Sequence, residues 1–253
     1  MHAVSSGLQH YLWFAVGLLV LTTLTVGLGF RARIGLGLVP LWAIGRAVVQ
    51  LAAVALLLRG ILEVPWTVAA FILLMLSTAS WTAMGRLDEL WHGRRTAVAG
   101  ILAGATVSLG MIFALHLVAF QVRYLIALGG IIIGSSMTAA TLAGRNFLRG
   151  SRARSSEVEA WLSLGATPKQ AHEEIGREAV RESLLPNLDQ TRSTGLVTLP
   201  GAFVGALFGG ASPAQAAQFQ LVVLAGIALT MMLTGIVVTQ LAGRTPYVLG
   251  SSA

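Results

Sequence analysis

The residues of this chain that could do chemistry are few and lie far apart in the sequence. Arg46 is the one charged residue inside an apolar stretch, and Gln50 follows one helical turn later on the same face. A charge at membrane depth costs roughly 3 kcal/mol, so such a side chain faces a partner or a water-filled cavity. Two interpretations stay open. The pair lines a translocation path for an anionic or polar solute, or Arg46 is structural and binds backbone carbonyls of an interrupted neighbouring helix.

The other reactive side chains form no catalytic or metal-binding pattern. The five histidines, at positions 2, 10, 92, 116 and 172, lack the spacing of metal ligands, and the chain has no cysteine. The single lysine, Lys169, does not follow the glycines of a phosphate-binding loop. No Asp or Glu lies in an apolar stretch, which disfavours a proton-coupled transporter. We expect no enzymatic activity, no metal site and no cofactor bound by this chain.

The composition predicts that these residues are positioned by membrane-spanning helices. Of the 253 residues, 55% are hydrophobic and 11% are charged, and the mean hydropathy is +0.78. Soluble proteins carry about 25% charged residues, so a soluble enzyme is excluded. A spanning helix needs roughly 20 apolar residues. Seven stretches meet or approach that length: Tyr11–Phe30, Gly35–Leu58, Pro65–Met84, Thr96–Leu117, Tyr124–Ala143, Thr194–Gly209 and Ala216–Ala242.

The basic residues predict the orientation of these spans. Fourteen of the seventeen fall on one side of the predicted membrane, which the positive-inside rule assigns to the cytoplasm. Seven spans then place the N-terminus outside and the C-terminus inside. The net charge of +7 is accordingly a topology signal rather than a sign of nucleic-acid binding. We predict an all-α, polytopic membrane protein, with residues 1–253 forming a single transmembrane permease domain.

One long polar connection, residues 144–193, is predicted to form a cytoplasmic helical hairpin. Ser156 and Glu159 have the spacing of a capping box, and Gly165 suits the residue after a helix C-terminus. A second helix is expected from Pro168 to about Leu185, with Thr167 as its N-cap. A solvated hairpin without further function is the plainer interpretation.

The same connection resembles the EAA loop of ABC-transporter permeases, a short cytoplasmic helix that docks on the ATP-binding subunit. The resemblance rests on Glu159-Ala160-Trp161, on Gly165 and on Ile175, with Trp161 in place of the second alanine. A rigid, capped helix of this kind would transmit the closure of a partner to the adjacent spans. The resemblance implies that the ATPase-coupling residues are Glu159, Ala160, Gly165, Ala166, Thr167, Pro168 and Ile175.

Further blocks make the chain similar to the FetB-type putative iron-export permease family, to which the plant aluminium-sensitivity permeases are related. The blocks are Ala127–Ala140, Leu164–Pro168, Gly195–Gly201, Gly209–Pro213 and Phe219-Gln220, together with Arg46 and Gln50-Leu51. Where that family usually has Met-Met-Thr after the Pro-Gly pair, this chain has Ala202-Phe203-Val204.

Prolines and glycines indicate where the path closes and where helices pack. Pro200-Gly201 can break the sixth span, so we expect a gate or hinge at Leu199–Gly201. The expected path residues are Arg46, Gln50, Met137, Pro200, Gly201 and Gln220. Glycines spaced four apart let helix backbones approach closely, either within the chain or along a homodimer seam. They are Gly130, Gly134, Gly201, Gly205 and Gly209.

The resemblance implies a permease subunit of an ABC transporter in a bacterial inner membrane. It would act as a homodimer in the lipid bilayer with a separate ATPase subunit that binds ATP and Mg²⁺, and it would export a metal ion such as iron or a metal-linked solute. Three alternatives stay open: an ATP-independent transporter or channel, an ABC permease for a nucleotide sugar or other organic solute, and a membrane component that regulates an ATPase.

Overall fold

The computed structural model describes residues 2–61 and 65–245, with side chains at residues 12–57 and 67–245. These residues are almost wholly helical and include one isolated bridge, between Thr194 and Thr198. Six of their helices are long and apolar enough to cross a membrane, which confirms the polytopic helical membrane fold. The six are α1 (His2–Arg31), α2 (Val39–Ile61), α3 (Pro65–Met84), α4 (Gly93–Ala114), α5 (Val122–Ala153) and α10 (Pro213–Ala242).

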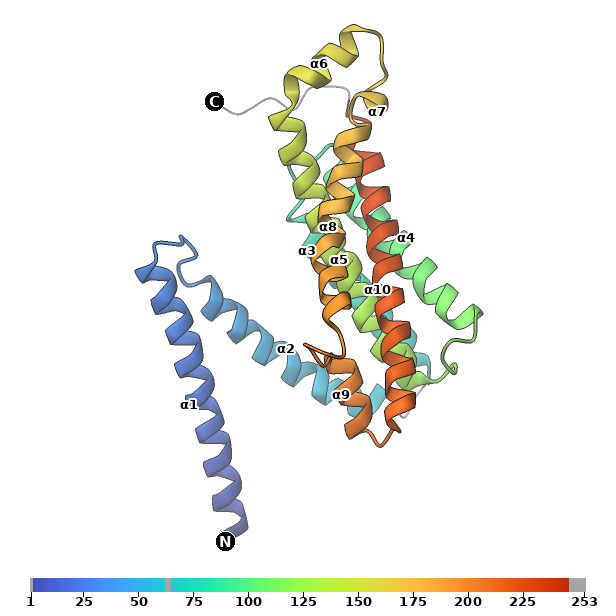
Figure 1. The fold of residues 1–253 in the computed structure, drawn as a ribbon. Helices are drawn as coiled ribbons and strands as arrows, with labels where there is room; N and C mark the ends of the chain where they lie inside the picture. The colour runs from blue at the N-terminus through green and yellow to red at the C-terminus, as the bar shows by residue number, and fades with distance from the viewer. Residues whose placement is uncertain (1, 62–64, 246–253) are drawn as a thin grey trace. The chain divides into compact units, whose positions relative to one another are not determined.

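The helices form two compact units, and each is described by itself. The first unit contains α1 and α2, which pack against each other and are joined by a turn in which Arg33, Gly35 and Gly37 have positive φ. The second unit contains α3 to α10, with α10 packed on α4 and α5 and with α3 packed on the same two helices (Figure 1). The single domain expected over residues 1–253 stays a prediction.

Close packing of α4 on α10 depends on two glycines that are four residues apart. A methyl group at Gly100 would lie 2.6 Å from Val238, and one at Gly104 would overlap the hydroxyl of Thr234. The same methyl at Gly104 would lie 2.8 Å from the carbonyl oxygen of Thr230. The two backbones can therefore approach only because these positions lack a side chain, as in small-residue contacts between membrane helices.

The predicted hairpin forms three helices rather than two. They are α6 (Ser155–Ser163), α7 (Pro168–Ala171) and α8 (Glu173–Ser193). The expected end of the second helix near Leu185 is wrong, because α8 continues through Pro186 to Ser193 along α5 and α10. The capping box of Ser156 and Glu159 is also wrong. A single non-helical residue, Arg154, separates α5 from α6, so Ser156 already lies inside the helix.

The sixth predicted span, Thr194–Gly209, is not one helix. Only α9 (Gly201–Phe208) is helical there, and eight residues reach about 12 Å at 1.5 Å per residue. Pro200 causes the break, because it lacks an N–H and holds the residue before it in an extended conformation. Gly195 has φ 96°, and its N–H donates to the carbonyl of Thr198, which closes a tight turn before the proline.

The chain nevertheless returns from one end of the second unit to the other. We call the end that carries α6 and α7 the hairpin end; the end of α10 lies there as well, since Gly243 is next to His172. The descending α8, the turn at residues 194–200 and α9 lead to Pro213, where α10 begins at the opposite end (Figure 1). Two helical pieces, α8 and α9, thus make this return, and its crossing of a bilayer stays a prediction. The orientation of these ends relative to the cytoplasm stays a prediction.

Replacing Gly104 by alanine should destabilise the second unit, because the added methyl overlaps Thr234. Overpacking of this kind costs about 1–3 kcal/mol, so the melting temperature of the protein in detergent should fall. Gly134→Ala is the matched control, since a methyl there would meet nothing within 4 Å. Equal melting temperatures for the two variants would contradict the close α4–α10 contact.

Candidate functional site

Helix α6 stands at the hairpin end with one face anchored and the other face open. Val158 is fully buried in a core cluster that also contains Phe147, Ala171 and Ile175, and Leu162 packs against it. Glu159 and Ala160 are exposed, Trp161 is 50% exposed and Leu164 is 81% exposed. A helix held by its inner face and presenting an aromatic and a leucine outward has the form of a docking surface.

The turn from α6 to α7 is specified by local sequence at every step. Gly165 has φ 88°; its N–H donates to Leu162, and the N–H of Ala166 donates to Trp161, which is a Schellman motif. Thr167 is the N-cap of α7: the N–H of Gln170 donates to its hydroxyl, and the Gln170 side chain accepts from the Thr167 N–H at 2.9 Å. The left-handed glycine and the threonine cap are therefore confirmed. Ile175 is buried, whereas Ala166 and Pro168 are half-buried.

His172 joins the hairpin to the rest of the second unit, a role the sequence spacing did not indicate. It is 2% exposed and lies between α7 and α8, where its Nδ1 is 2.9 Å from the carbonyl oxygen of Pro168. Its ring is 5.6 Å from that of Phe147 on α5, and its Nε2 has no partner among the described residues. Its burial could not be inferred from an isolated histidine in a polar segment.

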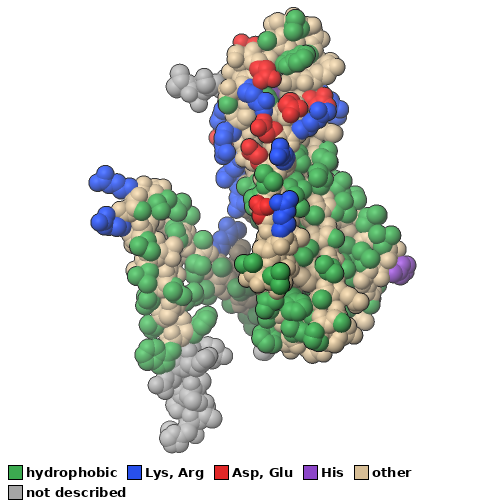
Figure 2. Space-filling view, in the orientation of Figure 1, with side chains coloured by type: hydrophobic (Ala, Val, Ile, Leu, Met, Phe, Trp, Pro, Cys, Tyr) green, Lys and Arg blue, Asp and Glu red, His purple; other side chains and the backbone are tan. Residues whose placement is uncertain are grey.

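Ion pairs connect the end of α5 to the elements around it. Arg154 pairs with Glu178 of α8 and lies 4.0 Å from Glu157 of α6. Arg152 pairs at 2.7 Å with Glu89 in the loop between α3 and α4. Each exposed pair contributes at most about 1 kcal/mol. Together they hold three elements around one helix end, and Figure 2 shows acidic and basic side chains gathered there.

The expected path residues belong to four different helices, α2, α5, α9 and α10. Met137 on α5 is half-buried and packs against two core clusters. Gln220 on α10 is 4% exposed, and its Oε1 has no partner in the described part of the chain. Pro200 is the N-cap of α9 and Gly201 its first residue.

The other two expected path residues lie on α2, and the predicted packing glycines lie on α5 and α9 or just after it. Arg46 and Gln50 are exposed residues of α2 in the first unit. A methyl group at Gly134, Gly201 or Gly205 would meet nothing within 4 Å, whereas one at Gly130 would lie 3.2 Å from Met75. A methyl group at Gly209 would lie 3.4 Å from the carbonyl oxygens of Gly205 and Ala206, which belong to its own helix. Of the five predicted packing glycines, only Gly130 therefore has a neighbour from another helix within 4 Å. The roles of these residues stay predictions.

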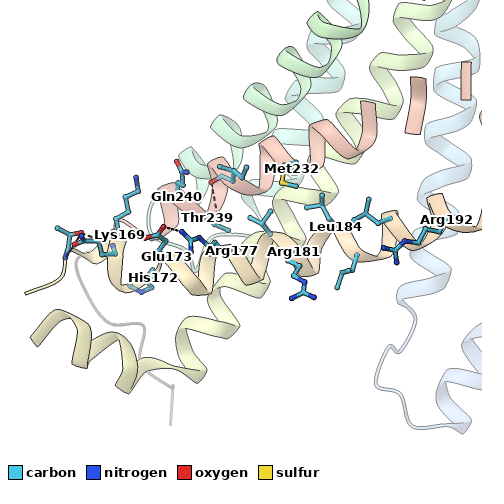
Figure 3. A pocket seen from close by; sticks show the side chains of 18 residues that line it. Lys169, His172, Glu173, Arg177, Arg181, Leu184, Arg192, Met232, Thr239 and Gln240 are labelled. Carbon is cyan, nitrogen blue, oxygen red and sulfur yellow. Dashed lines mark hydrogen bonds and ion pairs between the residues drawn. The ribbon is translucent and has the colours of Figure 1, made fainter. Parts of the chain in front are cut away.

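Two large hollows lie on the second unit, one towards each end. The first, which we call the α8–α10 groove, has a volume of about 980 Å³. It extends from Lys169 on α7 along α8 to Arg192, with Arg177 and Arg181 between them (Figure 3). The second has a volume of about 840 Å³ and lies between α5, α9 and α10, where Arg123, Tyr124 and Gly205 contribute to its wall. Residues 194–200 join α8, which lines the first hollow, to α9, which lines the second, and α10 contributes to both.

No group of three or more His, Asp or Glu side chains within residues 12–57 and 67–245 is arranged to hold a metal ion. The charges of the α8–α10 groove are Lys169, Glu173, Arg177, Arg181 and Arg192. Of these, Glu173 is paired with Arg177 at 2.5 Å. The site offers a docking helix and two hollows whose walls are mainly apolar, with a few charged side chains among them.

Comparison with known proteins places residues 12–247 in the Uncharacterised protein family (UPF0014). The chain is 34% identical to the UPF0014 membrane protein STAR2 of Oryza sativa subsp. japonica, over 83% of this chain and 77% of that protein. It is 32% identical to Protein ALUMINUM SENSITIVE 3 of Arabidopsis thaliana, over 81% and 76%. It is 29% identical to the Probable iron export permease protein FetB of Escherichia coli, over 90% and 89%. No solved structure matches.

Replacing Gly165 by alanine should loosen the turn between α6 and α7, because a left-handed conformation costs an L-residue about 1–2 kcal/mol. Hydrogen exchange at the Ala166 N–H, which is bonded to Trp161, should then become about tenfold faster. Leu164→Ala is the control, since Leu164 has φ −80° and is exposed. Unchanged exchange in Gly165→Ala would mean that the turn does not depend on the glycine.

Proposed function

Because the chain belongs to the UPF0014 family of multi-pass membrane proteins, we propose that it is the membrane-spanning subunit of an ABC transporter. The observation that carries the proposal is α6, an anchored helix with an open face at the end of a membrane-spanning bundle. A separate ATPase subunit docks on this face and binds the ATP and Mg²⁺. This chain binds no cofactor and catalyses no reaction. Two copies of the chain work with two copies of the ATPase in a bacterial inner membrane.

The coupling follows from how α6 is attached. Arg154 alone separates α6 from α5, and the same arginine pairs with Glu178 on α8. A displacement of α6 by the closing ATPases therefore moves α5 and α8 with it. The Schellman motif that ends α6 and the N-cap of α7 make the connection between these two helices rigid. Because α8 leads directly into the break at residues 194–200, this motion reaches the part of the crossing that is not helical.

The cargo we propose is a metal ion such as iron, or a metal-linked solute, moved outward. Support comes from the likeness to the E. coli relative, whose name describes a probable iron export permease. The path through the bilayer uses the two hollows on either side of the break.

Truncating the open face of α6 should weaken the complex with the ATPase. We expect Trp161→Ala and Leu164→Ala each to reduce co-purification with the Walker-motif ATPase at least tenfold, because both side chains are exposed on that face. Trp81→Ala, which removes a still more exposed tryptophan from α3, is the control and should bind as the wild type does. A wild-type chain that captures no ATPase in a nanodisc would refute the proposed partnership.

The substrate is tested by ATPase stimulation of the complex in nanodiscs, with iron, other metals, metal chelates and nucleotide sugars offered in turn. We expect stimulation by iron or an iron chelate. A response to a nucleotide sugar and none to any metal would replace the proposed cargo with an organic solute. Uptake or efflux in vesicles without ATP would instead favour an ATP-independent transporter. A complex that hydrolyses ATP but moves no solute would favour a regulatory role.

A further inference from the structure

The walls of the α8–α10 groove change in polarity along its length. At the hairpin end the lining is polar and basic, with Lys169, Arg177 and Arg181 from α7 and α8 and Gln240 from α10. Past Arg181 both walls become apolar, and their residues are Leu184, Leu185 and Leu188 on α8 and Ile236 and Met232 on α10. Figure 3 shows this order from Lys169 through Arg177 and Arg181 to Leu184. The groove therefore has a polar end and an apolar stretch.

The apolar stretch is open, although the helices touch beneath it. A methyl group at Gly235 of α10 would lie 3.3 Å from Val180, and one at Gly176 would lie 3.4 Å from Thr239, so α8 and α10 pack directly. Above this contact, Leu185 is 40% exposed and Met232 is 43% exposed. An apolar surface thus stays uncovered beside α10, a helix long and apolar enough to span a membrane.

The charges of the groove are mostly positive. Four basic side chains and one acidic side chain line it, which gives a net charge of +3. Glu173 is paired with Arg177 at 2.5 Å, and Arg192 at the far end is paired with Asp189 at 3.1 Å. Within residues 12–57 and 67–245, no carboxylate forms an ion pair with Arg181 or Lys169. These two cations are uncompensated, and Arg181 adjoins the apolar stretch.

The spacing of these groups matches a molecule with an anionic head and a hydrocarbon tail. Arg177 and Arg181 are one helical turn apart on the same face, so both guanidinium groups can reach one phosphodiester. From Arg181 the apolar wall extends to Leu188, about 10 Å further at 1.5 Å per residue. One leaflet of a bilayer has a hydrocarbon depth of about 15 Å, so the wall covers most of an acyl chain.

The position of the groove is one that membrane lipid can reach. It follows about the last three turns of α10, from Met232 to Gly243. The hairpin end, where its basic residues lie, is predicted to face the cytoplasm. Basic pockets between spanning helices on that side of a membrane bind the headgroups of anionic lipids. Charge, polarity and position therefore favour the same kind of ligand.

We propose that the α8–α10 groove binds an anionic phospholipid. Its phosphate lies at Arg181, with Arg177 beside it, and an acyl chain lies along Leu185 and Met232. Lys169 draws the negative headgroup towards the hairpin end. The inference goes beyond the proposed function and does not depend on it. Because the proposed path uses the same groove, a bound phospholipid and a passing solute would exclude each other there.

Lipid binding to the full chain is measured by native mass spectrometry in detergent, with phosphatidylglycerol and phosphatidylcholine of identical acyl chains as probes. We expect one phosphatidylglycerol per chain, bound at least tenfold more tightly than phosphatidylcholine. Arg181→Gln should weaken phosphatidylglycerol binding about fivefold, the factor for one basic group near anionic lipid. Arg149→Gln is the matched control, because Arg149 is exposed near the same end of α5 and does not line the groove.

The acyl chain is tested on the apolar wall. Leu185→Gln should weaken phosphatidylglycerol binding at least threefold, whereas Leu229→Gln should not change it. Leu229 is exposed to a similar degree on α10, at 37%, but lies outside the lining. Inorganic phosphate should not displace the phospholipid. Displacement by phosphate, together with unchanged binding in Leu185→Gln, would overturn the lipid site and leave a site for small anions.

Two further outcomes would overturn the proposal. Equal affinity for the two phospholipids would show that the groove does not select an anionic headgroup. Equal weakening in Arg181→Gln and Arg149→Gln would show a general attraction to a basic surface. All four substituted side chains are exposed, so the variants without lipid should melt at the temperature of the wild type. No ATPase is present in these measurements, so their failure is distinct from a failure of the proposed function.

Discussion

A bilayer core offers no hydrogen bonds to a backbone N–H or carbonyl, and this constraint decides most of what the second unit can be. Straight helices satisfy the constraint internally, so α3, α4, α5 and α10 need only apolar side chains and close contacts. The return through α8 and α9 does not satisfy it internally, because residues 194–200 leave the helix. The predicted crossing is consequently the part of the second unit that requires protein or water around it.

The hairpin end follows a different rule, because water is expected to satisfy its exposed groups. For this end to transmit motion, α6 must be rigidly attached to the bundle. The left-handed Gly165, the cap on Thr167 and the buried Val158 fix α6 at its end, at the following turn and along its inner face. His172 then connects the hairpin to Phe147 on α5, inside the same core. A stiff connection of this kind carries a displacement into the helices instead of absorbing it.

Sequence reasoning succeeded where the signal was local and failed where a distant contact decided the outcome. The glycine at position 165 and the Thr167–Gln170 cap depend on residues within one turn, and both were predicted correctly. The capping box at Ser156 failed because α5 runs almost directly into α6. The end of α8 was misplaced at Leu185 because packing on α5 and α10 carries the helix through Pro186. Residues 194–209 were predicted as one span from their apolar composition, but Pro200 confines the helix to Gly201–Phe208.

By itself the sequence determined the membrane class, four of the spans of the second unit and the presence of a polar hairpin, because hydropathy and caps are properties of short segments. Only the tertiary structure decided that polar α8 lies along apolar α10. That placement depends on Val180 and Leu184 meeting Gly235 and Met231, which are about fifty residues away in the chain. No window of sequence contains both sides of such a contact, and that contact lays a charged helix along one that is long and apolar enough to span a membrane.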